Sequence, residues 1–80
     1  MFIVKEIRAD GRPGYIAAPS GYARRKDGTV YRDGTDPRKS GPEMTAKYSE
    51  AHHFKTHRSA ALQASKIGSH TIIEDNTSAN

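Results

Sequence analysis

Four histidines come nearest to a reactive constellation in this chain: His52, His53, His57 and His70. His53 and His57 are four residues apart, and on a helix this spacing places two imidazoles on one face, as in zinc sites. Thr56, however, is a good helix N-cap, so His53 is expected to precede the helix. No glutamate stands between the two histidines to act as a base. We expect surface histidines, with no metal site and no cofactor.

Other catalytic arrangements have weaker support. A serine nucleophile needs a base and an oxyanion hole beside it, and no serine lies in a G-x-S-x-G turn between a strand and a helix. The carboxylates of Asp27, Asp33 and Asp36 lie in polar segments that we expect to be mobile, where a shifted pKa is hard to maintain. The glycines of Gly11-Arg12-Pro13-Gly14 lack the Gly-Lys-Ser or Gly-Lys-Thr ending of a phosphate-binding loop. We expect a protein that is not an enzyme.

A basic stretch with interleaved tyrosines is the strongest functional candidate. Between Arg8 and Lys39 the chain has eight Lys or Arg against four Asp. Cations alternating with aromatic rings can contact phosphates and stack on bases, but Tyr and Arg are also the residues that anchor protein interfaces. The interspersed aspartates, and the absence of an RNA-binding or helix-turn-helix signature, place a protein partner ahead of nucleic acid. The residues predicted to bind the partner are Tyr22, Arg24, Arg25, Lys26, Tyr31, Arg32, Arg38 and Lys39.

Length and composition narrow the class of protein. The chain has 80 residues and no cysteine, which excludes disulfides, thiolate nucleophiles and cysteine zinc sites, and supports one domain with a modest core. The N-terminus, MFIVKEIRAD, lacks the apolar region of a secretory signal, and no run approaches the roughly 18 apolar residues that span a bilayer. We therefore expect a soluble, cytoplasmic protein. Its formal net charge of +4 favours acidic partners.

The elements that would position the basic stretch begin with an N-terminal hairpin. Phe2 to Arg8 is rich in β-branched and aromatic residues, which predicts a strand. The turn Gly11-Arg12-Pro13-Gly14 follows, with glycines able to take positive φ and a proline that fixes φ. Tyr15 to Ala18 then returns as a second strand, which Pro19 ends because it cannot donate a ladder hydrogen bond.

The middle of the chain carries more ambiguous signals. Gly21 to Arg32 contains Asp27-Gly28, a dipeptide typical of tight hairpins, so an exposed hairpin and a mobile loop are both compatible with it. Residues 33–42 include no hydrophobic side chain and have the composition of a loop or a disordered segment. Met44 to Tyr48 alternates apolar and polar residues, which predicts a short edge strand.

The C-terminal part predicts one helix. Thr56 is the expected N-cap, Phe54 can pack back onto the first turn, and His57 is the first helical residue. Gly68 suits a left-handed C-cap. The apolar stripe of this helix consists of Ala60, Ala64 and Ile67. Its water-facing residues are expected to be Arg58, Gln63 and Lys66.

The order of these elements predicts the fold class. Ser69 to Glu74 is the last predicted strand, and residues 75–80 are polar enough to form a flexible tail. We expect an α+β fold, a small antiparallel β-sheet with one α-helix packed on one face. The domain would extend over residues 1–74, with a basic loop or hairpin inserted at about residues 21–42.

At its two ends the chain resembles short proteins that bacteriophage genomes encode in their early or accessory regions. The pieces that carry the resemblance are Phe2 to Arg8, Gly14 to Pro19, Phe54 to Ala64 and Thr71 to Glu74. They form a hairpin, a helix cap, a helix face and a strand, so the resemblance transfers no catalytic or binding residue. The long basic insertion departs from the pattern, and we expect any protein-specific activity there.

This resemblance implies a non-catalytic protein that binds and inhibits a host protein in the bacterial cytoplasm, such as a defence, CRISPR, transcription or replication component. Anti-CRISPR inhibitors belong to that class. The expected partner has an acidic surface and belongs to a nucleic-acid-handling complex, and no membrane is involved. A basic nucleic-acid-binding accessory protein is the alternative, and a small metal-dependent protein that uses the histidines comes third.

Overall fold

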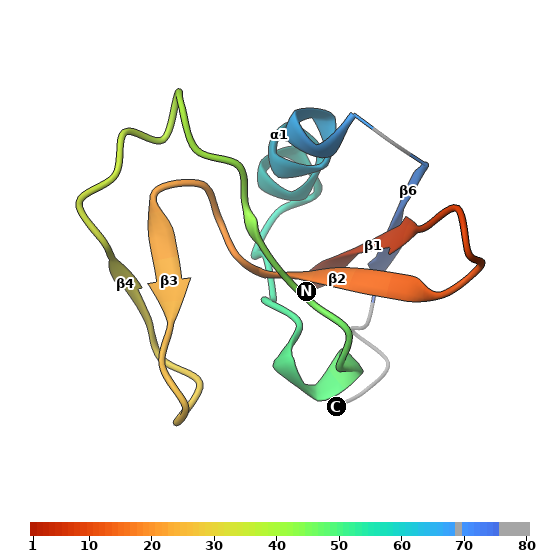
Figure 1. Ribbon diagram of the computed structural model, residues 1–80, viewed down its shortest axis with the longest axis horizontal. Helices are drawn as coiled ribbons and strands as arrows, with labels where there is room; N and C mark the ends of the chain where they lie inside the picture. Colours follow the sequence, from red (N-terminus) through yellow and green to blue (C-terminus); the bar gives the residue numbers. More distant parts are fainter. Residues whose placement is uncertain (69, 76–80) are drawn as a thin grey trace.

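The computed structural model describes residues 1–68 and 70–75. Within them the chain forms a four-stranded antiparallel sheet, a two-stranded antiparallel hairpin and one α-helix (Figure 1). The elements are β1 (Phe2–Ile7), β2 (Pro13–Ala18), β3 (Tyr22–Arg24), β4 (Val30–Arg32), β5 (Glu43–Thr45), the 3-10 helix η1 (Tyr48–Glu50), α1 (His57–Ile67) and β6 (Thr71–Asp75). The predicted α+β class, with the helix packed on one face of a small antiparallel sheet, is confirmed.

The four-stranded sheet is built around the N-terminal hairpin, with the strand order β5-β2-β1-β6. β1 and β2 form the predicted antiparallel pair, with Lys5 opposite Tyr15, but β2 begins at Pro13 rather than Tyr15, so Pro13 and Gly14 pair with β1 instead of forming the turn. Gly11 helps to close their connection with a φ of 82°, which glycine adopts without a steric cost. β6 pairs with the other side of β1 and places Ile73 opposite Val4. β5 and β6 are therefore the edges of this sheet.

Alternation along the central strands divides the core between the two faces of the sheet. Val4 and Ile16 are fully buried in one cluster with Phe54 and the helix residues Ala60 and Ala64. Because alanine side chains are short, they let α1 approach the sheet closely. The smaller cluster on the opposite face consists of Ile3, Tyr15 and Ala51.

Helix α1 begins and ends where local capping signals place it. The Thr56 hydroxyl oxygen accepts a hydrogen bond from the Ser59 amide at 3.1 Å, which satisfies one of the free amides of the first turn. Gly68 ends the helix in the left-handed conformation, with a φ of 72°. Among the described residues, no helix is long and apolar enough to cross a membrane.

Two helix residues that were expected to face water form hydrogen bonds to distant loops: Gln63 is half-buried, whereas Lys66 is exposed as predicted. Oε1 of Gln63 accepts hydrogen bonds from the amide and hydroxyl of Ser20, at 2.9 and 3.1 Å. The Lys66 ammonium donates to the carbonyl oxygen of Pro37 at 2.9 Å. The helical pattern alone could not predict these bonds, because the segments that supply the partners lie 43 and 29 residues away in sequence.

The edge strand predicted over residues 44–48 is wrong in its bounds, since β5 covers Glu43–Thr45. The Lys47 amide donates to the side-chain oxygen of Thr45 at 3.2 Å, a local bond that turns the chain out of the ladder. Tyr48 begins η1 instead, and its ring packs edge-on against Tyr15 with 5.4 Å between ring centroids. Alternation in sequence indicated a strand here, but turn chemistry shortens it.

The last strand is shifted relative to its prediction. β6 begins at Thr71 rather than Ser69, and Asp75, assigned to the tail, pairs with Phe2 at the end of the ladder. Ser69 and residues 76–80 lie outside the described residues. Asp75 belongs to the strand because it lies opposite Phe2, the first residue of β1, a pairing that composition could not indicate.

Candidate functional site: a cationic hairpin and the cleft beside it

The basic segment forms a hairpin of β3 and β4, which resolves the two interpretations that the sequence left open. The Arg25 amide donates to the carbonyl oxygen of Thr29 at 2.8 Å, and Gly28 has a φ of 95° in the turn. Oδ1 of Asp27 accepts from both the amide and the hydroxyl of Thr29. Those bonds lower the pKa of Asp27, the side-chain hydroxyl bond having the largest effect.

The same turn chemistry occurs twice, because Asp27-Gly28-Thr29 is repeated as Asp33-Gly34-Thr35 six residues later. Oδ1 of Asp33 accepts from the amide and hydroxyl of Thr35, at 3.0 and 2.6 Å, and Gly34 has a φ of 86°. These bonds, the hydroxyl first, lower the pKa of Asp33. The repeated tripeptide is visible in the sequence, but we did not predict a second turn from it.

The carboxylates interspersed with the cations are therefore engaged in local turns. Asp36 follows the pattern, since its Oδ1 accepts from the Arg38 amide at 2.9 Å. The cations that form ion pairs within the described chain are Lys5, Arg8, Arg12, Arg38 and the N-terminal amine. The hairpin cations are not among these ion pairs of the described residues.

Cross-strand register gives the hairpin two different faces. Tyr22 lies opposite Arg32 and Arg24 lies opposite Val30, so alternation places these four side chains on one face. Tyr31 belongs to the other face, where the Arg25 guanidinium lies 4.2 Å from the centroid of its ring. The tyrosine rings on both faces are exposed, at 39% for Tyr22 and 38% for Tyr31.

The structure brings six of the eight predicted partner-binding residues together and places two elsewhere. The residues on the hairpin or its turn are Tyr22, Arg24, Arg25, Lys26, Tyr31 and Arg32. Arg38 and Lys39 lie in the loop after the hairpin, where Arg38 is paired with Asp36 and the neighbouring Pro37 carbonyl is bound by Lys66 of α1. These two cations therefore belong to a region near the C-terminal end of the helix.

Long-range contacts fix the hairpin relative to the core. Oε2 of Glu43, on β5, accepts from the backbone amide of Arg24 at 2.9 Å. The connection before the hairpin is held by the Gln63 bonds to Ser20, whose side chain is only 3% exposed. The following loop packs against Gly21, where a Cβ would lie 3.1 Å from Cβ of Pro37. The hairpin is thus joined to both the sheet and the helix.

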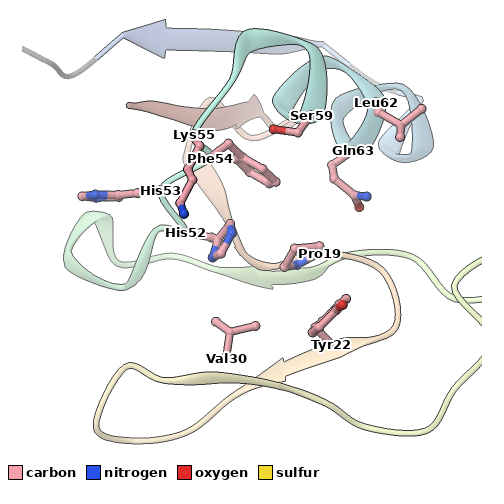
Figure 2. A pocket seen from close by; sticks show the side chains of 10 residues that line it. All are labelled: Pro19, Tyr22, Val30, His52, His53, Phe54, Lys55, Ser59, Leu62 and Gln63. Atoms are coloured by element: carbon pink, nitrogen blue, oxygen red, sulfur yellow. The ribbon is translucent and has the colours of Figure 1, made fainter.

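An open cleft of about 530 Å³ lies between the hairpin and α1 (Figure 2). Tyr22 and Val30 rise from the hairpin toward it, and Gln63 extends from the helix on the opposite side (Figure 2). Ser59 and Leu62 complete the helix wall, and Leu62 is 61% exposed. The cleft depends on the anchoring contacts just described, since they hold its two walls at a fixed separation.

The floor and mouth of the cleft come from the connections between elements. Pro19 and Phe54 supply apolar floor, and the imidazole of His52 packs edge-on against Phe54, with ring centroids 4.6 Å apart. Lys55 lines the mouth, and His53 points away from the centre (Figure 2). The lining is mostly apolar and includes no carboxylate.

The histidines occupy separate structural positions. The His52 amide donates to the carbonyl oxygen of Ile16 at 2.7 Å, which fixes the residue beside the cleft. Burial lowers the pKa of its imidazole, and the charges of His53 and Arg24 lower it further. His57 packs edge-on against Phe2, away from His52. Within the described part of the chain, no three His, Cys, Asp or Glu side chains are grouped as metal ligands.

Of the ten residues that line the cleft, only Tyr22 was predicted to bind a partner, and the nine others include His52, Leu62 and the anchoring residue Gln63. Leu62 carried a weak signal, because it is a large apolar side chain outside the alanine stripe of the helix. Comparisons with protein-family models, curated proteins and solved structures give no match for this chain. Its function is therefore inferred from the geometry of the hairpin and the cleft.

Proposed function

We propose that this chain is a non-catalytic binding protein whose hairpin docks on the acidic surface of another protein and blocks it. The observation that carries the proposal is the combination of hairpin cations that form no ion pair within residues 1–68 and 70–75 with an apolar cleft at their side. Such a surface combines charge steering with apolar burial, which together favour protein association.

Charge supports an acidic partner. The segment over residues 21–42 has six Lys or Arg and three Asp, and each of the three carboxylates accepts hydrogen bonds from its own turn. Arg24, Arg25 and Arg32 present planar guanidinium groups, which can bind carboxylates with two parallel hydrogen bonds. A protein surface rich in Asp and Glu would supply those carboxylates.

Apolar content favours a protein over nucleic acid. Tyr22 and Tyr31 lie on opposite faces of the hairpin, so the two rings cannot form one platform for successive stacked bases. Tyr22 instead forms one wall of the cleft with Val30, facing Leu62 across it. An open apolar cleft beside cations suits the side-chain anchors of a protein interface.

The biological setting of the proposal comes from the resemblance to phage accessory proteins. It favours a partner in the bacterial host cytoplasm, within a complex that handles nucleic acid in defence, transcription or replication. Inhibition would follow from occupancy, because a protein of this size that covers an acidic contact surface competes with whatever normally binds there.

An affinity pull-down from nuclease-treated bacterial lysate tests the proposal. The wild type is compared with the Arg25→Glu, Arg32→Glu double variant, and with a control of equal charge change, Arg12→Glu with Lys47→Glu, whose positions lie outside the hairpin. One stoichiometric protein retained by the wild type and the control, and lost by the hairpin variant, is the expected result. Loss of all captured material on nuclease treatment would contradict it and favour nucleic-acid binding.

Salt dependence separates the two classes of partner. Binding through phosphates releases counterions, so affinity for nucleic acid would fall by about 10³ or more between 50 and 200 mM salt if six or more phosphates were contacted. A protein complex with an apolar anchor should survive moderate salt, with most of the loss in the association rate. A dissociation constant that follows the steeper dependence would overturn the proposal.

A further inference from the structure

A second hollow borders the cleft beside the hairpin. The lining of the two hollows together indicates the chemistry of a ligand that could lie along both. The second hollow has a volume of about 490 Å³ and shares Val30, His52 and His53 with the first. Arg24 and Gly28 line it on the hairpin side. Because they share three lining residues, the two hollows are adjacent, and we call them together the furrow, which lies beside the hairpin face carrying Tyr22 and Arg24.

The furrow is positive and partly apolar along its length. No Asp or Glu lines either hollow, whereas Lys55 lines one and Arg24 the other. Met1 also borders the second hollow, but its N-terminal amine is paired with the Asp75 carboxylate at 3.9 Å. Lys55 lies beside His52 and His53, which line both hollows (Figure 2), so a ligand that follows the furrow would meet cations from there into the second hollow and apolar side chains at the α1 end.

The larger and more apolar of the two hollows is the cleft at α1. Leu62 is the most exposed large hydrophobic residue of the described chain, and it lines this cleft together with Tyr22 and Val30. One apolar side chain entering there would cover all three at once. A peptide segment can carry an aliphatic or aromatic side chain for the cleft and carboxylates for the cations on one flexible chain. Nucleic acid carries aromatic bases and phosphates instead. The apolar cleft together with the positive charge therefore favours a peptide segment.

We propose that the furrow binds an extended acidic segment of the partner protein, with one apolar side chain in the cleft and carboxylates near Lys55 and Arg24. This inference rests on the proposed function and adds the contact chemistry of the partner. The apolar side chain lies between the hairpin and α1. The flanking carboxylates extend along the hairpin face toward the second hollow.

A synthetic probe tests the inference without knowledge of the partner. The probe is a short peptide of glutamate and serine with one central phenylalanine, and the control peptide has serine in place of the phenylalanine. Amide NMR spectra of the labelled full-length protein are recorded during titration with each peptide. The phenylalanine peptide should shift the amides of Tyr22, Val30 and Leu62 and bind at least about threefold more tightly than the control peptide, because it removes more apolar surface from water.

Two variants make the test specific. Leu62→Gln keeps a good helix former at an exposed position, so the protein should remain folded, and it should remove most of the preference for phenylalanine. Lys47→Gln, at an exposed position that lines neither hollow, should leave that preference unchanged. Equal affinity for the two peptides, or equal effects of the two variants, would overturn the inference.

The outcomes separate this inference from the proposed function. If the hairpin charge reversal abolishes capture of the partner while the two peptides bind equally, the furrow inference falls and the proposed function stands. If the charge reversal has no effect on capture, both fall. Shifts of the same three amides with a single-stranded oligonucleotide, or on raising the protein concentration without peptide, would also overturn the acidic segment as the occupant.

Discussion

Replacing Gln63 with methionine removes the contact that joins the helix to the start of the hairpin. A single oxygen of Gln63 accepts both the amide and the hydroxyl of Ser20, and Ser20 is 3% exposed. The backbone N–H of Ser20 can only donate a hydrogen bond. The side-chain atom of Gln63 that it meets must therefore be the oxygen and not the nitrogen. Its loss leaves a buried N–H without an acceptor, which costs about 1–3 kcal/mol, whereas the hydroxyl can rotate. Methionine and glutamine have similar helix propensities, so the helix itself should be unaffected.

Gln63→Met should therefore lower the free energy of unfolding by about 1–3 kcal/mol, or roughly 4–8 °C in melting temperature per kcal/mol. Urea titration followed by far-ultraviolet circular dichroism measures the change. Hydrogen exchange of the Ser20 amide should accelerate in the same variant, since that amide loses its only acceptor among the described residues.

Gln63→Glu is the matched control. A carboxylate oxygen at the same place can accept both bonds, so this variant should lose less than about 1 kcal/mol. Equal stability of the methionine and glutamate variants would refute the reasoning, because it would show that the acceptor at Gln63 does not hold the hairpin connection to the helix.

Three further predictions concern the supports of the fold. Gly21→Ala should lower the free energy of unfolding by about 1–2 kcal/mol, because the φ of 85° is unfavourable for alanine and the added Cβ would press on Pro37. The control Gly41→Ala should be nearly neutral, because that position has open space and no positive φ. Equal melting temperatures for the two variants would contradict this packing. Thr56→Ala removes the N-cap of α1 and should cost about 1 kcal/mol in urea unfolding, and an unchanged midpoint would show that the cap contributes little. His52 has a lowered pKa when folded, so the unfolded chain binds more protons and stability should fall as pH drops through about 6.5, the unfolded value. Stability measured from pH 8 to pH 5 should therefore decline less in His52→Gln than in the wild type, and parallel curves would oppose this assignment.

Elements whose signals are local could be predicted from the sequence. α1 depends on a cap at Thr56 and a left-handed glycine at Gly68, both within a few residues of its ends, and its bounds match the prediction. The β1–β2 hairpin likewise depends on its own turn. The Asp27-Gly28 signal permitted the second hairpin without deciding it, because few apolar residues surround it in sequence.

The cleft could not be predicted, because no local signal specifies it. Its walls come from the hairpin and from α1, and the contacts that set their separation are between residues far apart in sequence, Ser20 with Gln63 and Pro37 with Lys66. A helical pattern identifies the face that meets the core, but it does not identify which loop folds over the polar side. Long-range hydrogen bonds of polar side chains are the part of this structure that the sequence pattern leaves undetermined.

The measurement that tests the central claim most directly is amide hydrogen exchange of the full chain, with and without the captured partner. The account predicts that binding protects residues 22–32 and the cleft-facing part of α1, including the amide of Leu62. It predicts little change on the opposite face of the sheet, near Ile72 and Lys5. Protection confined to that opposite face or to the β6 edge, with the hairpin amides exchanging as in the free protein, would contradict the claim that the hairpin is the binding surface.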